Sequence, residues 1–164
     1  MTLRTIISFL TLLFLINVQG QTRTLVGKVI NDEFYPIYLV SIFSADSVLL
    51  TKSDTSGNFS ITIPLDTKTL LVADVGMEWK SLELLSDCNN LDIVLQPSAT
   101  YDFMSPAKVD RLRKKQFDKL PALYKSAFEK GIFKKDKPCY VDKFIPHKKA
   151  MLESHRARKR MPST

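Results

Sequence analysis

The chain has 164 residues, which gives room for one domain and an appendage. Its composition is 45% hydrophobic and 25% charged, with five Gly and eight Pro, as in ordinary globular proteins and not in fibrous or low-complexity chains. The net charge of +7 is divided unevenly. Residues 21–98 carry five Lys/Arg against ten Asp/Glu, a balance of −5, whereas residues 99–164 carry eighteen against seven, a balance of +11. Such asymmetry is typical of a folded module followed by an interaction tail.

The N-terminus has the pattern of a signal peptide. Arg4 precedes an apolar run, Ile6–Val18, and Val18-Gln19-Gly20 places small or short residues at a cleavage site. The run is too short for a membrane-spanning helix, which needs about twenty residues. Residues 1–20 are therefore predicted to be removed, giving a secreted or periplasmic chain that begins at Gln21 and has no transmembrane segment. The alternatives are a buried helix or an uncleaved anchor.

Residues 21–98 have the pattern of short strands. Turn residues recur about every ten positions from Thr24 to Leu95, as in an all-β sandwich. In the clearest strand Phe59, Ile61 and Ile63 alternate with polar residues, so they are expected to share a buried face. The predicted strands are Thr24–Ile30, Tyr38–Phe43, Val48–Ser53, Asn58–Ile63, Thr69–Val75, Trp79–Leu84 and Leu91–Gln96.

The strongest local signal is the segment Asp54-Thr55-Ser56-Gly57-Asn58. Asp54 at the first position of a type I turn can accept hydrogen bonds from its own backbone, and Gly57 tolerates the positive φ that reverses the chain. A calcium loop is the alternative, since Asp54 and Asn58 carry oxygen ligands. The spacing does not match an EF-hand and no Glu closes the loop, so a structural turn is favoured.

The order of several motifs resembles a known family. These are Gly27-Lys28-Val29-Ile30, Pro36-Ile37, Thr51–Ile61, Leu70-Leu71-Val72 with Gly76, and Ile93–Pro97. Together they resemble the carboxypeptidase regulatory-like domain, although Ser53 stands where that family usually has Thr. The resemblance implies a seven-stranded transthyretin-like, prealbumin-type β-sandwich of the kind exported by Bacteroidota, with no catalytic residues. The expected fold is thus mainly β over residues 21–98, followed by a basic, partly helical tail over 99–164.

The tail is predicted to contain two short helices. Ser105-Pro106 is a suitable helix start, with Ser as the N-cap, and Pro121 divides the following pattern near Lys119. Gly131 is expected to end the second helix. The end of the tail is interrupted by prolines and is expected to be largely irregular, with a last helix over Met151–Arg160. The apolar positions of the two helices are Val109, Leu112, Phe117, Leu120, Tyr124 and Phe128.

Two cysteines, Cys88 and Cys139, are present. In an oxidising compartment they can form one disulfide, which would fasten the tail to the sandwich and contribute about 2–4 kcal/mol. Two free thiols are the alternative. Metal binding is not expected, because no Cys-x-x-Cys or neighbouring His completes a ligand set.

No catalytic or cofactor-binding pattern is found. His147 and His155 are the only histidines, and only Glu153 stands near them at a ligand spacing. There is neither a Gly-x-Ser-x-Gly motif nor a phosphate-binding Gly-rich loop. We therefore expect no enzyme activity, no cofactor and no metal.

The basic tail indicates the class of partner. Its clusters, Arg111–Lys115, Lys134–Lys137, Lys148-Lys149 and Arg156–Arg160, suit lipid headgroups or acidic polysaccharide. Nucleic acid is not expected because the chain is exported. The alternative is that these are solvated helix faces, some of them paired with the acidic sandwich. Two functions remain: a non-enzymatic accessory or interaction module of the cell envelope, which would contact another envelope protein, and a protein that binds anionic surfaces through its tail.

Overall fold

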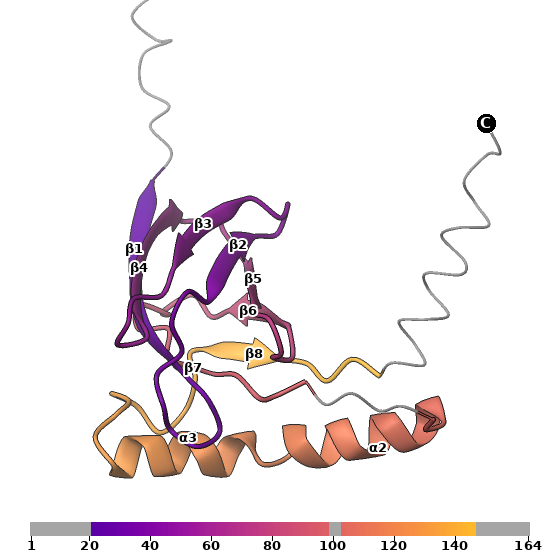
Figure 1. Ribbon diagram of the computed structural model, residues 1–164. Coiled ribbons are helices and arrows are strands. Elements are labelled where there is room, and N and C mark those ends of the chain that lie inside the picture. The colour runs from indigo at the N-terminus through magenta and orange to yellow at the C-terminus, as the bar shows by residue number, and fades with distance from the viewer. Residues whose placement is uncertain (1–20, 99–102, 147–164) are drawn as a thin grey trace, which may run out of the picture.

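The computed structural model describes residues 21–98 and 103–146. The predicted signal peptide, both histidines and the predicted last helix lie outside these residues. The described chain forms two β-sheets and two helices (Figure 1). In chain order its elements are β1 (Thr22–Ile30), β2 (Ser41–Ser44), β3 (Leu49–Lys52), β4 (Asn58–Pro64), β5 (Thr69–Ala73), β6 (Lys80–Leu84), β7 (Ile93–Val94), α2 (Pro106–Phe117), α3 (Leu120–Glu129) and β8 (Tyr140–Asp142).

The two sheets have the strand orders β4-β1-β7 and β3-β2-β5-β6-β8. β1 pairs antiparallel with β4, from Thr22 opposite Pro64 to Lys28 opposite Asn58, and parallel with β7. The predicted alternation in β4 is confirmed, since Phe59, Ile61 and Ile63 are buried while their neighbours are exposed. A mainly β fold is therefore correct.

The predicted strands are present, but several are shorter than expected. β2 begins at Ser41 and not at Tyr38, because Leu39 has a φ of +61°, outside the extended region. β7 comprises only Ile93 and Val94 of the six residues predicted there. Hydrophobic runs that continue past a strand end misled the prediction at these positions.

The sequence prediction was wrong about one part of the tail, which was expected to be irregular. Residues Tyr140–Asp142 form strand β8, which pairs antiparallel with β6, with Leu82 opposite Asp142 and Leu84 opposite Tyr140. Three residues close to Pro138 are too few to show a period of two. The free backbone edge of β6 provides the pairing that the local sequence does not predict.

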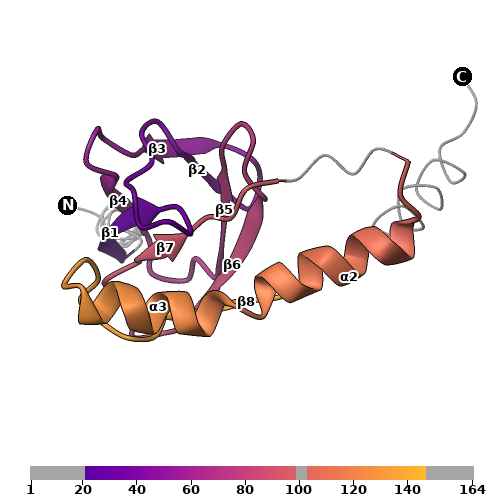
Figure 2. The ribbon, with the colours of Figure 1, turned by 60° about the horizontal axis from the view of Figure 1, so that its bottom comes forward.

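Two short helices, as predicted, follow the sandwich. Pro106 and Pro121 each occupy the first turn of a helix, where the missing N–H removes no intrahelical bond. Ser105 takes the N-cap position, but the expected side-chain cap is absent; only its carbonyl accepts hydrogen bonds from α2. Gly131, with φ +69°, follows the end of α3. The helices run along one end of the sandwich, with α3 below β7 and α2 extending outward (Figures 1 and 2).

The helical segment shares the hydrophobic core of the sheets. Leu25, Leu91 and Ile93 from the sandwich belong to the same buried cluster as residues from α3 and the segment after it. The residues beyond position 98 that belong to this cluster are Leu120, Tyr124, Ala127, Phe133, Cys139 and Tyr140.

Within the described ranges, no helix is long and apolar enough to cross a membrane.

Candidate functional site

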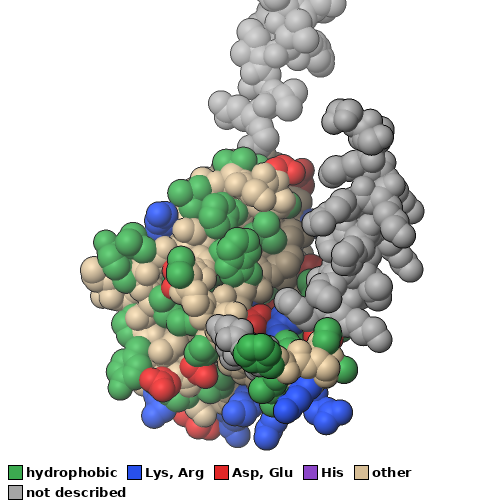
Figure 3. Space-filling model, turned by 45° about the vertical axis from the view of Figure 1, so that its right-hand side comes forward, with side chains coloured by type: hydrophobic (Ala, Val, Ile, Leu, Met, Phe, Trp, Pro, Cys, Tyr) green, Lys and Arg blue, Asp and Glu red, His purple; other side chains and the backbone are tan. Residues whose placement is uncertain are grey.

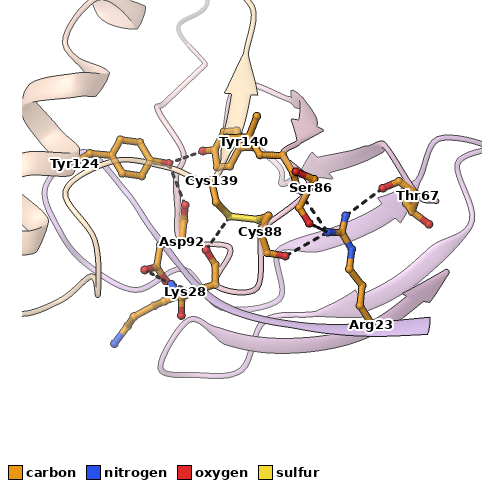
Figure 4. Close-up of a disulfide and its surroundings, with 11 residues drawn as sticks. Arg23, Lys28, Thr67, Ser86, Cys88, Asp92, Tyr124, Cys139 and Tyr140 are labelled. Carbon is orange, nitrogen blue, oxygen red and sulfur yellow. Dashed lines mark hydrogen bonds between the residues drawn. A yellow bond between two sulfur atoms is a disulfide. The ribbon is translucent and has the colours of Figure 1, made fainter. Parts of the chain in front are cut away.

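A disulfide fastens the helical segment to the sandwich. Cys88, in the loop after β6, is bonded to Cys139, just before β8, and their Cα atoms are 5.1 Å apart (Figure 4). Both side chains are buried. The bond joins positions 51 residues apart, so the helices are enclosed in a covalent loop that begins and ends at the sandwich.

The loop that carries Cys88 is held by Arg23 of β1. The guanidinium group of Arg23 donates hydrogen bonds to the carbonyl oxygens of Ser86 and Thr67, each at 3.2 Å (Figure 4). A longer bond, of 3.5 Å, reaches the carbonyl oxygen of Cys88 itself. Arg23 therefore orders the sandwich side of the disulfide.

A buried tyrosine of α3 covers the outer edge of β7. The hydroxyl group of Tyr124 donates to the carbonyl oxygen of Asp92 and accepts the N–H of Val94, both at 3.1 Å. Its single proton is thereby used, so the hydroxyl of Tyr140, which also contacts it, must be the donor in that hydrogen bond. Burial raises the pKa of both tyrosines. The pair forms a buried hydrogen-bond network that joins α3 and β8 to β7.

Asp92 is the buried carboxylate closest to this network. It accepts hydrogen bonds from the side chain of Asn90 and from the backbone N–H groups of Lys28 and Lys134, the last two at 3.2 and 3.3 Å. Burial raises its pKa despite these bonds. Because its oxygens accept from donors in three segments of the chain, the carboxylate connects these segments.

Helix α2 is attached to the sandwich through polar contacts. Arg113 makes a two-pronged contact with Glu78, with Nε–Oε1 at 3.1 Å and Nη2–Oε2 at 2.9 Å. The carbonyl oxygen of Gln116 accepts a hydrogen bond of 2.8 Å from the side chain of Gln96. Arg113 thus pairs with the acidic sandwich. This is the alternative stated from the sequence, in which some cations of the tail pair with the sandwich.

The opposite side of α2 carries cations that point to solvent. Four basic residues follow one another at steps of three or four positions: Lys108, Arg111, Lys115 and Lys119. They therefore share one side of α2 and of the short connection to α3. All four are exposed, and none takes part in an ion pair within residues 21–98 and 103–146. We call these four residues the basic face. Figure 3 shows basic side chains gathered at this end of the molecule.

The segment around Asp54 and Gly57 forms a turn. Oδ1 of Asp54 accepts the N–H groups of Ser56 and Asn58, both at 2.8 Å. Gly57 has a φ of +76°, and a Cβ atom built there would lie 2.4 Å from the carbonyl oxygen of Val29. The carboxylate therefore organises its own turn. Within the described ranges, no group of three His, Cys, Asp or Glu residues could hold a metal ion.

Sequence reasoning identified basic clusters but not the basic face. The cluster Arg111–Lys115 contains residues with opposite roles, because Arg113 and Lys114 form ion pairs with Glu78 and Asp118. The helical period could have separated them: the exposed cations recur at steps of three and four, whereas Arg113 follows the buried Val109 by one turn.

No protein-family model matches the chain, and no curated protein matches it. The fold and the surface define the class to which the molecule belongs: a β-rich protein with a disulfide-fastened helical extension that exposes one cationic side.

Proposed function

We propose that this protein is a non-enzymatic, exported module of the cell envelope that docks on anionic surfaces through the basic face. The resemblance of residues 27–97 to the carboxypeptidase regulatory-like domain supports a transthyretin-like sandwich as its scaffold. The apolar run Ile6–Val18 supports a secreted or periplasmic location.

The observation that carries this proposal is the exposure of four cations on an anchored helix. Lys108, Arg111, Lys115 and Lys119 face solvent, while Arg113 fixes the other side of the helix to Glu78. Near an anionic membrane, each Lys or Arg contributes about 1 kcal/mol to binding. Because the helix is already folded and attached, little ordering entropy opposes that gain.

The test is salt-dependent binding of the chain from Gln21 onward to two anionic surfaces: vesicles containing phosphatidylglycerol, and alginate beads. Binding should be much weaker at about 300 mM NaCl than at about 50 mM NaCl, since salt screens exposed charges. The variant Lys108→Gln/Arg111→Gln/Lys115→Gln should lose about 3 kcal/mol, roughly a hundredfold in affinity.

The matched control is Lys52→Gln/Lys68→Gln/Lys125→Gln, which changes the net charge by the same amount away from the basic face. Each of these lysines is exposed. The control should retain most of the binding. Equal losses in the two triple variants would show that net charge, and not the basic face, determines docking. Export is tested separately, because the N-terminus of the exported chain should be Gln21.

A further inference from the structure

We infer that the anionic surface is a phospholipid bilayer, into which Phe103 inserts beside the basic face. This inference rests on the proposed function and names its target. The relevant feature is a group of exposed apolar residues just before and within α2. Phe103 is fully exposed, and Met104 and Leu112 expose 39% and 38% of their surface.

Leu112 places apolar surface directly among the cations. It follows Lys108 by four residues and precedes Lys115 by three, so it borders the basic face on the same side of α2. Phe103 and Met104 precede the helix by only a few residues. Figure 3 shows hydrophobic side chains next to the basic ones at this end of the molecule. Binding at a membrane interface combines burial of apolar surface with attraction of Lys and Arg to anionic headgroups, and both kinds of side chain are exposed here.

The ring of Phe103 has an unusual backbone setting and no aromatic neighbour. Phe103 has a φ of +62°, in the left-handed region that bulky residues rarely adopt. Within the described residues Phe103 makes no ring–ring contact, whereas Phe117 packs on Phe144 with ring centroids 5.7 Å apart. Among the described residues, its ring is therefore fully exposed and unpacked.

Charge and apolar exposure together discriminate between the two anionic surfaces. A bilayer offers headgroup phosphates to Lys108, Arg111 and Lys115, and hydrocarbon to the ring of Phe103. An acidic polysaccharide offers carboxylates but no apolar interior. Removing the ring should therefore weaken binding to a bilayer and leave binding to a polysaccharide unchanged.

The experiment compares Phe103→Ser with native protein, using the chain from Gln21 onward. The probes are alginate beads and phosphatidylcholine vesicles with and without phosphatidylglycerol. The anionic vesicles contain roughly 30% phosphatidylglycerol, to provide the negative surface potential that attracts basic segments. Phe103→Ser should reduce binding to anionic vesicles about tenfold or more, which corresponds to loss of one buried aromatic side chain. Binding to alginate should not change.

The matched control is Leu65→Ser, which removes another exposed apolar side chain. Leu65 exposes 51% of its surface and its N–H bonds the carbonyl oxygen of Gln21. That places it at the start of β1, at the end of the sandwich away from the helices (Figure 1). This variant should bind vesicles like the native protein. Both substitutions are at exposed sites outside strands and helices, and an unchanged circular dichroism spectrum and melting temperature would establish that they fold.

Two outcomes would overturn the inference, and they differ from failure of the proposed function. If Phe103→Ser binds anionic vesicles as tightly as native protein, the ring does not insert. If Phe103→Ser and Leu65→Ser weaken vesicle binding equally, apolar exposure at the start of α2 has no special role. The proposed function itself fails if the native chain shows no salt-sensitive binding to either vesicles or alginate.

Discussion

Replacing Tyr124 by Phe tests how α3 is attached to the sandwich. The substitution keeps the buried ring and removes only the hydroxyl that accepts from Val94 and donates to Asp92. A backbone donor and a backbone acceptor would then be buried without partners. Each such group costs about 1–3 kcal/mol, so we expect the two together to lower the free energy of unfolding by about 2–6 kcal/mol.

Tyr140→Phe is the matched comparison. It removes the hydroxyl that donates to Tyr124, but Tyr124 keeps both of its backbone partners. The expected loss is therefore only about 0.5–1.5 kcal/mol. Equilibrium unfolding in guanidinium chloride, with the disulfide intact in every variant, measures both values. If Tyr140→Phe costs as much as Tyr124→Phe, the hydroxyl of Tyr124 does not satisfy the edge of β7 and this reasoning is wrong.

Three further predictions concern the same framework. Gly57→Val should destabilise the protein by about 1–3 kcal/mol or more, because of the positive φ and the close carbonyl oxygen of Val29, whereas Ser56→Ala should have little effect; equal melting temperatures would contradict the turn geometry. The double variant Cys88→Ala/Cys139→Ala should lose about 2–4 kcal/mol in the same unfolding assay, and a peptide map of native protein that shows two alkylated thiols would argue against the bond. The free energy of unfolding should fall as pH rises above about 10. Tyrosines of the unfolded chain release their protons there, whereas burial raises the pKa of Tyr124 and Tyr140, which keep theirs in the folded protein. Unfolding curves from about pH 8 to about pH 11 should show a smaller loss of stability in Tyr140→Phe than in native protein.

Local patterns in the sequence predicted much of the scaffold. The alternation of Phe59, Ile61 and Ile63 predicted β4 and its buried face, and Pro121 predicted the break between the helices. These features depend on residues close together in the chain. Strand ends were less predictable: Leu39 continues a hydrophobic run, but its left-handed φ keeps it out of β2.

The contacts that organise the candidate site depend on the tertiary fold. Tyr124 was predicted to lie on an apolar helix face, yet nothing near it in sequence indicates that its hydroxyl meets Asp92 and Val94, about thirty positions earlier. β8 was missed for the same reason, because its partner β6 lies more than fifty residues away. The basic face, by contrast, has a local period that helix geometry alone could have revealed.

The helical segment closes the sandwich at two places. Strand β8 extends the five-stranded sheet past β6, and Tyr124 occupies the free backbone groups of β7. A chain cut after Ser98 would expose both strands as open edges, which readily pair with other chains. Such a fragment should self-associate even though it retains every strand of the predicted sandwich. The part of the molecule that resembles a separate tail in sequence therefore covers the edges of β6 and β7 in the folded protein.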